Sequence, residues 1–494
     1  MKARLLAAWC VVCLGASAAR GHPNAPCEGG TANEFACSNV ELLAHVSLGF
    51  FGSSRANDIW GWTDPITGVE YALLGVSVGT AVVDLSSPHH PVIVGTLPSS
   101  TSESVWRDIK VYADHAFIVS EAPGHGMQVL DLRQLASVTS PPVTFTSDAN
   151  YLEFGAAHNI AIDEDTGFAY VVGSATCSGG LHMIDLVDPA NPSFAGCYSG
   201  DGYTHDTQCV VYAGPDVEHR GREVCFSSNL DTVTIVDVTD KSNPLLLSRT
   251  GYDHEYTHQG WLTEDHRYFL LGDELDEVRN GHGSRTYVWD LSDLDAPFLV
   301  GHHTGVTAAI DHNQYVRGNH VFQANYRSGL RILRLGNLDL AEMGEVAYFD
   351  TAPEADNPNF AGAWGVYPFF DSGIVVVSDI DRGLFVLKPD LDAVLDCEDG
   401  LDNDRDGLID TDDPGCPFPS TFPEDPRCDD GIDNDGDGLI DFDDPVCSLS
   451  WPYWEKTPGC GLGFELAFLL PLLTALRRRR SGWRTPAQPR RTLP

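Results

Sequence analysis

The chain alternates short apolar runs with polar turns, and one form of this pattern recurs along most of its length. From Glu70 to Pro98, two apolar runs are separated by Gly79, an aspartate follows, and a third apolar run comes after a turn that contains proline. Such runs, bounded by turn residues, are typical of antiparallel strands. The same pattern returns over residues 179–199, 231–251 and 285–305. The sequence therefore predicts one building block used many times.

Alignment on the apolar–apolar–Asp–apolar strand of this block gives seven units. Successive copies are 44 to 54 residues apart, and each has room for four short strands. A four-stranded unit repeated at this spacing predicts an all-β fold, a seven-bladed β-propeller over residues 38–390. The aligned positions are Asp84, Asp131, Asp185, Asp237 and Asp290, followed by Arg334 and Lys388 in two degenerate copies.

The last unit ends at Lys388 without a fourth strand, and a matching strand stands near the other end of the chain, at residues 40–47. We therefore predict that the N-terminal strand completes blade seven and closes the ring, which removes an exposed sheet edge. A solenoid of stacked hairpins is the alternative.

The strand–turn phrase V-V-D-L-S-x-P-x-x-P, seen at residues 82–91, and a distinct pattern of histidines resemble the choice-of-anchor B family. The resemblance covers roughly residues 38–390. It implies a seven-bladed propeller of LVIVD-type repeats at the cell surface, and it implies no established activity.

The innermost strand of four blades begins with a histidine that precedes a carboxamide or a carboxylate, and Asp58 and Asp108 occupy the second of these positions in blades one and two. In a propeller these positions converge at the mouth of the central channel. The loops between second and third strands open on the same face, and the longest, residues 272–284, is the most charged. The candidate ligand residues are Asp58, Asp108, His158, His205, His258, His312, Asp273 and Glu274.

Imidazoles and carboxylates around a channel can bind a divalent transition metal, which can activate water for hydrolysis. Alternatively, each histidine bonds a neighbour or a backbone carbonyl and fixes the blade packing. The sequence contains no phosphate-binding glycine loop. The strings G-x-S-x-G (residues 75–79) and H-E-x-x-H (residues 254–258) do occur, but both lie in the strand-rich repeats, without the helix that these motifs require, so no catalytic residue is assigned. We predict a binding or adhesion module, with a metal-dependent hydrolase or lactonase as the alternative.

After Pro389 the chain becomes strongly acidic, and residues 397–416 and 428–447 repeat each other in register. Alternate aspartates on a tight glycine turn supply the oxygens that calcium prefers, whereas a solvated acidic linker is the alternative. The predicted calcium ligands are Asp402, Asp404, Asp406, Leu408 (carbonyl), Asp410 and Asp413, then Asp433, Asp435, Asp437, Leu439 (carbonyl), Asp441 and Asp444. The repeats resemble thrombospondin type 3 repeats, which implies a calcium-stiffened stalk over residues 391–450.

Residues 1–18 resemble a secretory signal peptide, with Lys2 and Arg4, an apolar run and small residues before the cleavage point, although a short buried helix is the alternative. A lead segment, residues 19–37, follows. Ten further cysteines fall in near pairs, which indicates disulfides in an oxidising compartment. The predicted pairs are Cys27–Cys37, Cys177–Cys197, Cys209–Cys225, Cys397–Cys416 and Cys428–Cys447.

The net charge is −41, from 71 acidic and 30 basic residues. Such a field repels nucleic acids, so we expect no nucleic-acid partner. The expected ligand is an extracellular protein or a glycan.

The C-terminal part of the sequence has three segments. A spacer covers residues 451–458, and residues 459–480 contain an apolar run followed by four arginines. A basic tail covers residues 481–494. The apolar run is shorter than the ~20 residues that span a bilayer unaided. One interpretation is a stop-transfer helix. The pattern also resembles myxobacterial C-terminal sorting signals, which implies processing near Cys460 and anchoring through it. Both interpretations predict an exported protein that is tethered to a membrane or cell surface.

Overall fold

The computed structural model describes residues 24–391. The predicted signal peptide, the acidic repeats with the pairs Cys397–Cys416 and Cys428–Cys447, and the anchor Cys460 lie outside the described residues.

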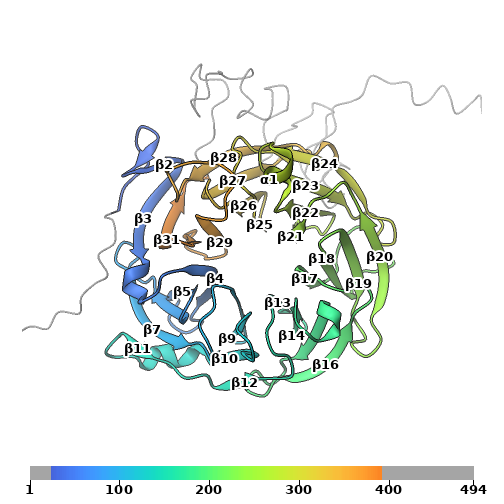
Figure 1. The fold of residues 1–494 in the computed structure, drawn as a ribbon, viewed down its shortest axis with the longest axis horizontal. Coiled ribbons are helices and arrows are strands. Elements are labelled where there is room, and N and C mark those ends of the chain that lie inside the picture. The colour runs from blue at the N-terminus through green and yellow to red at the C-terminus, as the bar shows by residue number, and fades with distance from the viewer. Residues whose placement is uncertain (1–23, 392–494) are drawn as a thin grey trace, which may run out of the picture. The chain divides into compact units, whose positions relative to one another are not determined.

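Seven antiparallel sheets are arranged in a ring around a central channel, and each forms one blade (Figure 1). The prediction of a seven-bladed β-propeller is confirmed, and the solenoid is excluded. The innermost strands are β4 (Ala56–Thr63), β8 (Arg107–Tyr112), β13 (Asn159–Asp163), β17 (Asp206–Val211), β21 (Thr257–Leu262), β25 (Asn313–Arg317) and β29 (Ala363–Tyr367). The second strands are β5 (Glu70–Val76), β9 (His115–Ser120), β14 (Phe168–Val172), β18 (Glu223–Ser228), β22 (Tyr268–Asp273), β26 (His320–Ala324) and β30 (Val375–Asp379).

The two outer positions of each blade complete the sheets. The third strands are β6 (Gly79–Asp84), β10 (Met127–Asp131), β15 (Leu181–Asp185), β19 (Thr232–Asp237), β23 (Arg285–Asp290), β27 (Leu330–Leu335) and β31 (Gly383–Pro389). The outermost strands are β7 (Val92–Pro98), β12 (Ala149–Tyr151), β16 (Ser193–Tyr198), β20 (Leu245–Gly251), β24 (Phe298–Thr304), β28 (Met343–Phe349) and β3 (Val40–Ser47). Helix is limited in the described residues to α1 (Asp276–Asn280) and the short 3-10 turns η1 (Leu48–Phe51), η2 (Leu132–Ser137), η3 (Cys177–Gly179) and η4 (Leu338–Leu340).

The repeated aspartate at the end of the third strand has a local structural role. In blade one, Oδ1 of Asp84 accepts a hydrogen bond of 2.7 Å from the backbone N–H of Ser86, which forms an Asx turn. The other four aspartates accept the same bond, in each case from the backbone N–H of the residue two positions later. These four are Asp131, Asp185, Asp237 and Asp290. The aspartate therefore belongs to the scaffold, where it directs the chain from the third strand into the turn.

The N-terminal strand closes the ring as predicted, because β3 pairs antiparallel with β31 from Val40 opposite Pro389 to Ser47 opposite Gly383. The lead segment adds a feature that the repeat pattern does not contain. Its hairpin, β1 (Thr31–Ala32) and β2 (Phe35–Ser38), extends blade six through pairing of β2 with β28. The first described residues thus fasten blade six and blade seven together.

Blade two departs from the repeat after its third strand. The chain forms η2 and then β11 (Val143–Thr144), which pairs in parallel with β7 of blade one. Only then does β12 return to blade two, as an outer strand of three residues. This detour crosses between neighbouring blades and ties blade one to blade two.

Three of the five predicted disulfides lie within the described residues, and all three are formed. Cys27–Cys37 joins the lead segment to β2. Cys177–Cys197 lies within blade three and Cys209–Cys225 within blade four, where the latter links directly opposed residues of β17 and β18.

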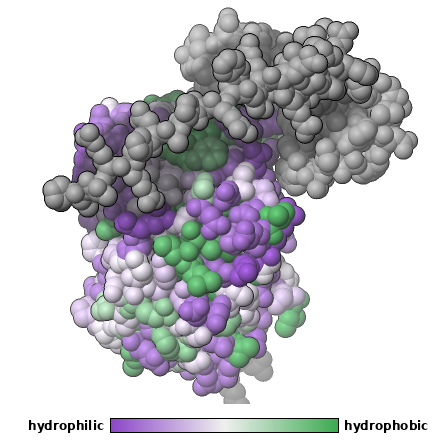
Figure 2. All heavy atoms as spheres, turned by 90° about the vertical axis from the view of Figure 1, so that its right-hand side faces the viewer, coloured by the Kyte–Doolittle hydropathy of each residue, from purple (hydrophilic) through white to green (hydrophobic). Residues whose placement is uncertain are grey.

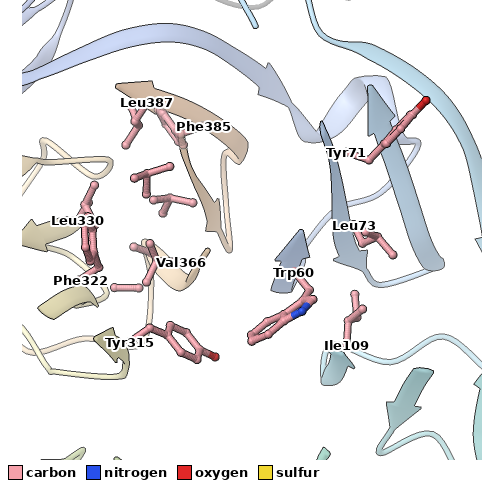
Figure 3. Packing of buried hydrophobic residues seen from close by; sticks show 14 of the residues in the cluster. Trp60, Tyr71, Leu73, Ile109, Tyr315, Phe322, Leu330, Val366, Phe385 and Leu387 are labelled. Carbon is pink, nitrogen blue, oxygen red and sulfur yellow. The ribbon is translucent and has the colours of Figure 1, made fainter. Parts of the chain in front are cut away.

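The hydrophobic core lies mainly between adjacent blades. One cluster packs Phe226 and Ile235 of blade four against Phe269 and Trp289 of blade five. Another joins blades one, two, six and seven, and Figure 3 shows part of it, with Leu73 and Ile109 on one side and Phe385 and Leu387 on another. On the side shown in Figure 2, apolar residues on the described surface form small groups among polar ones. No helix in residues 24–391 is long and apolar enough to cross a membrane.

Candidate ligand site at the channel mouth

Four histidines from consecutive blades form a continuous row at one end of the channel. His158, His205, His258 and His312 immediately precede, or lie within, the innermost strands of blades three to six. Neighbouring ring centroids are 4.3 Å, 4.3 Å and 4.5 Å apart along the row. The repeat therefore places one imidazole per blade at the same height and in mutual contact.

The hydrogen bonds of this row fix the orientation of two rings. Nδ1 of His205 lies 3.0 Å from the backbone oxygen of His258, and Nδ1 of His312 lies 2.5 Å from that of Trp364. A carbonyl oxygen only accepts, so each Nδ1 must carry the proton and donate it. In the neutral tautomer, Nε2 of each ring is then left with a free lone pair.

Three of the four histidines, His205, His258 and His312, are held neutral. Burial, followed by the influence of His158, lowers the pKa of His205 well below its usual value. Burial and the neighbouring His205 do the same for the pKa of His258, and burial lowers the pKa of His312 to about 3. At neutral pH these imidazoles are therefore hydrogen-bond acceptors or metal ligands and carry no positive charge.

Glu274, which follows β22, supplies a carboxylate beside two of these rings. Its oxygens lie 3.8 Å from Nε2 of His258 and 4.0 Å from Nε2 of His312. The hydroxyl of Tyr326 donates a hydrogen bond of 2.7 Å to Oε1 of Glu274. Burial raises the pKa of Glu274 to about 7. At the other end of the row, Nδ1 of His158 lies 2.7 Å from Oε1 of Glu121.

The donor set of His258, Glu274 and His312 suits a divalent transition metal. One ligand atom from each residue lies within 4.8 Å of the others. A zinc ion with bonds of about 2.0–2.2 Å keeps its donors roughly 3.4 Å apart, so small side-chain shifts bring the three into range. Two imidazoles and one carboxylate leave coordination positions open for a ligand or for water.

Asp58 and Asp108 lie on the same channel, but their oxygens serve the scaffold. Oδ2 of Asp58 accepts a hydrogen bond of 2.9 Å from the backbone N–H of Ile109, in the next blade. Oδ2 of Asp108 accepts one of 2.7 Å from Ile160, in the blade after that. The two carboxylates therefore clamp three consecutive blades together at the channel wall.

Asp206, which follows His205 in the histidine pattern, and Lys110, which the pattern does not contain, complete this inner group. Nζ of Lys110 donates a hydrogen bond of 2.6 Å to Asp108 and lies 4.5 Å from the ring centre of Trp60. Burial opposes the charge on Lys110, but Asp108 and Asp58 outweigh it and raise its pKa. Burial, followed by the charge of Asp108, raises the pKa of Asp206 to about 7.

Asp273, the remaining candidate, is buried under the loop that carries Glu274. Its two oxygens accept hydrogen bonds from the backbone N–H groups of Tyr256 (2.6 Å) and Glu255 (2.8 Å), and from the hydroxyl of Tyr252. This aspartate holds the turn that precedes His258. Its hydrogen bonds therefore position the segment that leads into the site.

Further along, aromatic side chains from four blades narrow the channel. Figure 3 shows Trp60 of β4 and Tyr315 of β25 pointing toward one another, and their ring centres are 5.6 Å apart. Trp261 and Tyr367 pack against this pair, with Trp261 4.8 Å from Tyr315 and Tyr367 5.2 Å from Trp60. A cavity of about 530 Å³ is lined by these aromatic residues and by Asp58, Asp108 and Asp206. The four histidines do not line it, so the channel mouth is a separate site.

The LVIVD repeat family matches residues 154–199, which contain all four strands of blade three. The protein is a seven-bladed β-propeller that carries an LVIVD repeat. A comparison with curated proteins finds no significant match. One similar solved structure is a crystal structure of a protein from Lactobacillus plantarum, with 14% identity and a TM-score of 0.45 over 65% of this chain and 88% of that one. Another is the β-propeller domain of Cps50 (Swd1) from Myceliophteria thermophila, with 10% identity and a TM-score of 0.44 over 68% of this chain and 98% of that one.

In this propeller, the repeated strands form the ring, and residues specific to single blades add further polar groups at the channel mouth. Glu274 and Tyr326 belong to loops of blades five and six, whereas the histidines recur in four blades. Tyr326 lies in the loop between the second and third strands of blade six. Its contact with Glu274 depends on the spatial neighbourhood of two blades, which no local pattern contains.

Proposed function

We propose that the protein is an exported, surface-anchored binding module that takes its ligand at the channel mouth. One observation carries this proposal: a row of neutral imidazoles leaves Nε2 of His258 and His312 facing the carboxylate of Glu274. Such a convergent set of polar groups in a ring of rigid strands is typical of a binding site.

The ligand class and the tether are part of the same proposal. An extracellular protein or a glycan is the proposed partner, since the net charge of −41 disfavours nucleic acid. The three disulfides in the described residues support a location in an oxidising compartment. The aspartate spacing of the tandem repeats supports a calcium-bound stalk, and the C-terminal pattern supports a surface tether.

A second candidate function is a metal-dependent hydrolase or lactonase. The observation that favours it is the set of two imidazoles and one carboxylate, because zinc in such a site keeps an open position at which water becomes a nucleophile. In both proposals a divalent transition metal at His258, Glu274 and His312 is the chemical centre of the mouth.

The deciding experiment measures metal content and binding on the full-length protein. We expect zinc-loaded, dialysed wild type to retain one equivalent of zinc at the mouth, and His258→Ala to lose it. The exposed His90 is the matched control, so His90→Ala should retain the metal. A screen against arrays of glycans and extracellular proteins, with chromogenic esters and lactones in parallel, then separates a module from an enzyme.

Each result of this screen discriminates. Array binding that His258→Ala abolishes, without turnover, supports the module. Turnover that His258→Ala abolishes supports the hydrolase. Binding and turnover that are the same in wild type and His258→Ala would show that the mouth is not the functional site.

A further inference from the structure

A second group of ionisable side chains lies next to the channel mouth and shares no residue with the histidine set. Asp276 and Glu277 come from α1, and Asp311 comes from the segment before β25. One carboxylate oxygen from each lies within 4.8 Å of the others. The three residues are 2%, 1% and 4% exposed, respectively. We call this group the acidic pocket.

Most oxygens of the acidic pocket have no hydrogen-bond donor from outside the group. Within residues 24–391, Oδ1 of Asp276, both carboxylate oxygens of Glu277 and Oδ1 of Asp311 are buried without a hydrogen-bond partner. Only Oδ2 of Asp276 has a clear donor, the hydroxyl of Tyr287 at 2.8 Å. A buried carboxylate without a donor costs several kcal/mol, so four such oxygens at one place require compensation, either by bound protons or by a cation.

The protein supplies little positive charge at this place. In the described part of the chain, no lysine or arginine forms an ion pair with Asp276, Glu277 or Asp311. The nearest basic group is His282, whose Nε2 lies 3.7 Å from Oδ2 of Asp276. One imidazole does not balance three carboxylates.

From this geometry we propose that the acidic pocket binds a hard divalent cation of the calcium type. Calcium takes carboxylate oxygens at 2.3–2.6 Å and accepts irregular arrangements of six to eight ligands, which backbone carbonyls or waters can complete. The four unpartnered oxygens provide the first ligands. A set of oxygen donors suits such a cation better than a transition metal, which prefers nitrogen or sulfur.

The backbone is shaped to admit Asp311. A Cβ atom placed on Gly272 would lie 2.1 Å from Oδ2 of Asp311, so only glycine allows the carboxylate to lie against β22. Close contact with β22 therefore holds the carboxylate of Asp311 in the acidic pocket. A surface side chain that moved freely would not be held in this way.

The cation would stabilise the two segments that carry the mouth donors. Glu274 stands two residues before Asp276, and His312 follows Asp311 directly. Bound calcium would join α1 to the start of β25 and so hold Glu274 beside His312. The cation proposal stands independently of the proposed function, because none of its ligands belongs to the histidine set.

Calcium binding is tested on the full-length protein, with wild type and Glu277→Gln carrying the same acidic repeats. Calcium bound per chain is counted by equilibrium dialysis, and the melting temperature of the propeller is measured by near-UV circular dichroism in calcium and in EGTA. We expect Glu277→Gln to bind one equivalent less calcium and to lose the calcium-dependent rise in melting temperature that wild type shows.

The competing explanation is that the carboxyl groups share protons and bind no cation. Glu277→Gln would then relieve repulsion, so it would melt at the same or a higher temperature than wild type in both buffers and bind the same amount of calcium. That result overturns the proposal. Asp311→Asn serves as the second variant if Glu277→Gln does not fold, and equal calcium counts for Asp311→Asn and wild type would likewise overturn it. Zinc retention by His258→Ala, measured separately, reports on the mouth alone.

Discussion

Two neighbouring residue positions at the start of the innermost strands form two polar layers with different roles. In the layer of the histidines, Nδ1 of His205 and of His312 bonds to the backbone, while Nε2 of His312 lies 4.0 Å from Glu274 at the mouth. In the layer of the aspartates, Asp58 and Asp108 give their oxygens to backbone N–H groups of the next blade. The difference shows that the unpaired atoms decide the role of a polar residue at a repeat position. A residue whose polar atoms all bond to the backbone supports the fold, and a residue with an unpaired atom can bind a ligand.

Two glutamine side chains, like the aspartates, accept hydrogen bonds from backbone N–H groups of the next blade. Oε1 of Gln259 accepts a hydrogen bond of 3.0 Å from the backbone N–H of Gln314, and Oε1 of Gln208 accepts one of 2.8 Å from Leu262. Between blades three and four, Nδ2 of Asn159 donates a hydrogen bond of 3.2 Å to the backbone oxygen of His205. Blades one to six are thus linked in series by side chain to backbone bonds at the channel wall. Variants that separate the two layers test this comparison.

The largest effect is expected for Asp108→Ala. This change leaves the buried N–H of Ile160 without its acceptor and Lys110 without its closest counter-ion, at 2.6 Å. Loss of one partner of a buried pair typically costs about 3–5 kcal/mol, so we expect a decrease of that size in the free energy of unfolding. Denaturant titration measures it. Asp253→Ala, at an exposed aspartate, should leave stability within about 0.5 kcal/mol of wild type.

The pH dependence of stability gives a smaller effect that also originates in the aspartate layer. Burial raises the pKa of Asp206 from 3.8 to about 7, so the folded state binds its proton more tightly than the unfolded state does. The contribution of Asp206 is therefore most favourable below about pH 4 and is lost as pH rises to about 7. One proton gives a slope of at most about 1.4 kcal/mol per pH unit.

Asp206→Asn isolates this contribution, since the amide does not titrate. Unfolding free energies measured between pH 4 and pH 8 should fall less steeply for Asp206→Asn than for wild type. Parallel curves for the two proteins would show that Asp206 is ionised normally in the folded state. The histidine layer should not add to the slope above pH 7, because its low pKa values keep the rings neutral there.

The smallest effect is expected for Tyr326→Phe at the mouth. The change keeps the buried ring, which packs 4.6 Å from His312, and removes only the hydroxyl that donates to Glu274. Loss of such an orienting partner typically weakens metal binding by about 10-fold, with the fold intact. Zinc titration by calorimetry measures the change. If Tyr326→Phe binds zinc as tightly as wild type while His258→Ala does not, the tyrosine has no positioning role.

The sequence predicted the parts of the fold that depend on local period. The spacing of Asp84 and its six counterparts predicted the blade number, and the missing strand after Lys388 predicted the partner of residues 40–47. It did not predict the crossing of β11 to blade one, because the stretch between Asp131 and its prolines is longer than in the other blades and the segment after it bonds to a neighbouring blade. Pairing of a two-residue strand is decided by the tertiary surroundings, which outweigh its weak local preference.

The site was predicted only in part, because contacts between blades decide which of its residues face the mouth. The pattern placed His158 to His312 on one face, but it did not separate Asp58 from the ligand-facing groups, since the acceptor role of Asp58 depends on Ile109 in another blade. The acidic pocket was missed entirely. Asp276 and Asp311 are distant in the sequence, and only the contact of β22 with the segment before β25 brings them together.

The ring closure also determines how the propeller responds to a pulling force. The chain leaves the propeller after Pro389, at the end of β31, which is hydrogen-bonded to β30 on one side and to β3 on the other. A pull on the chain after this point therefore acts on a strand that two neighbours hold. If β31 were the outermost strand, the same pull would only have to break the hydrogen bonds between β31 and β30, one after another. With β3 outside it, two ladders must give way together, so closure by the N-terminal strand makes the exit point of the chain mechanically strong.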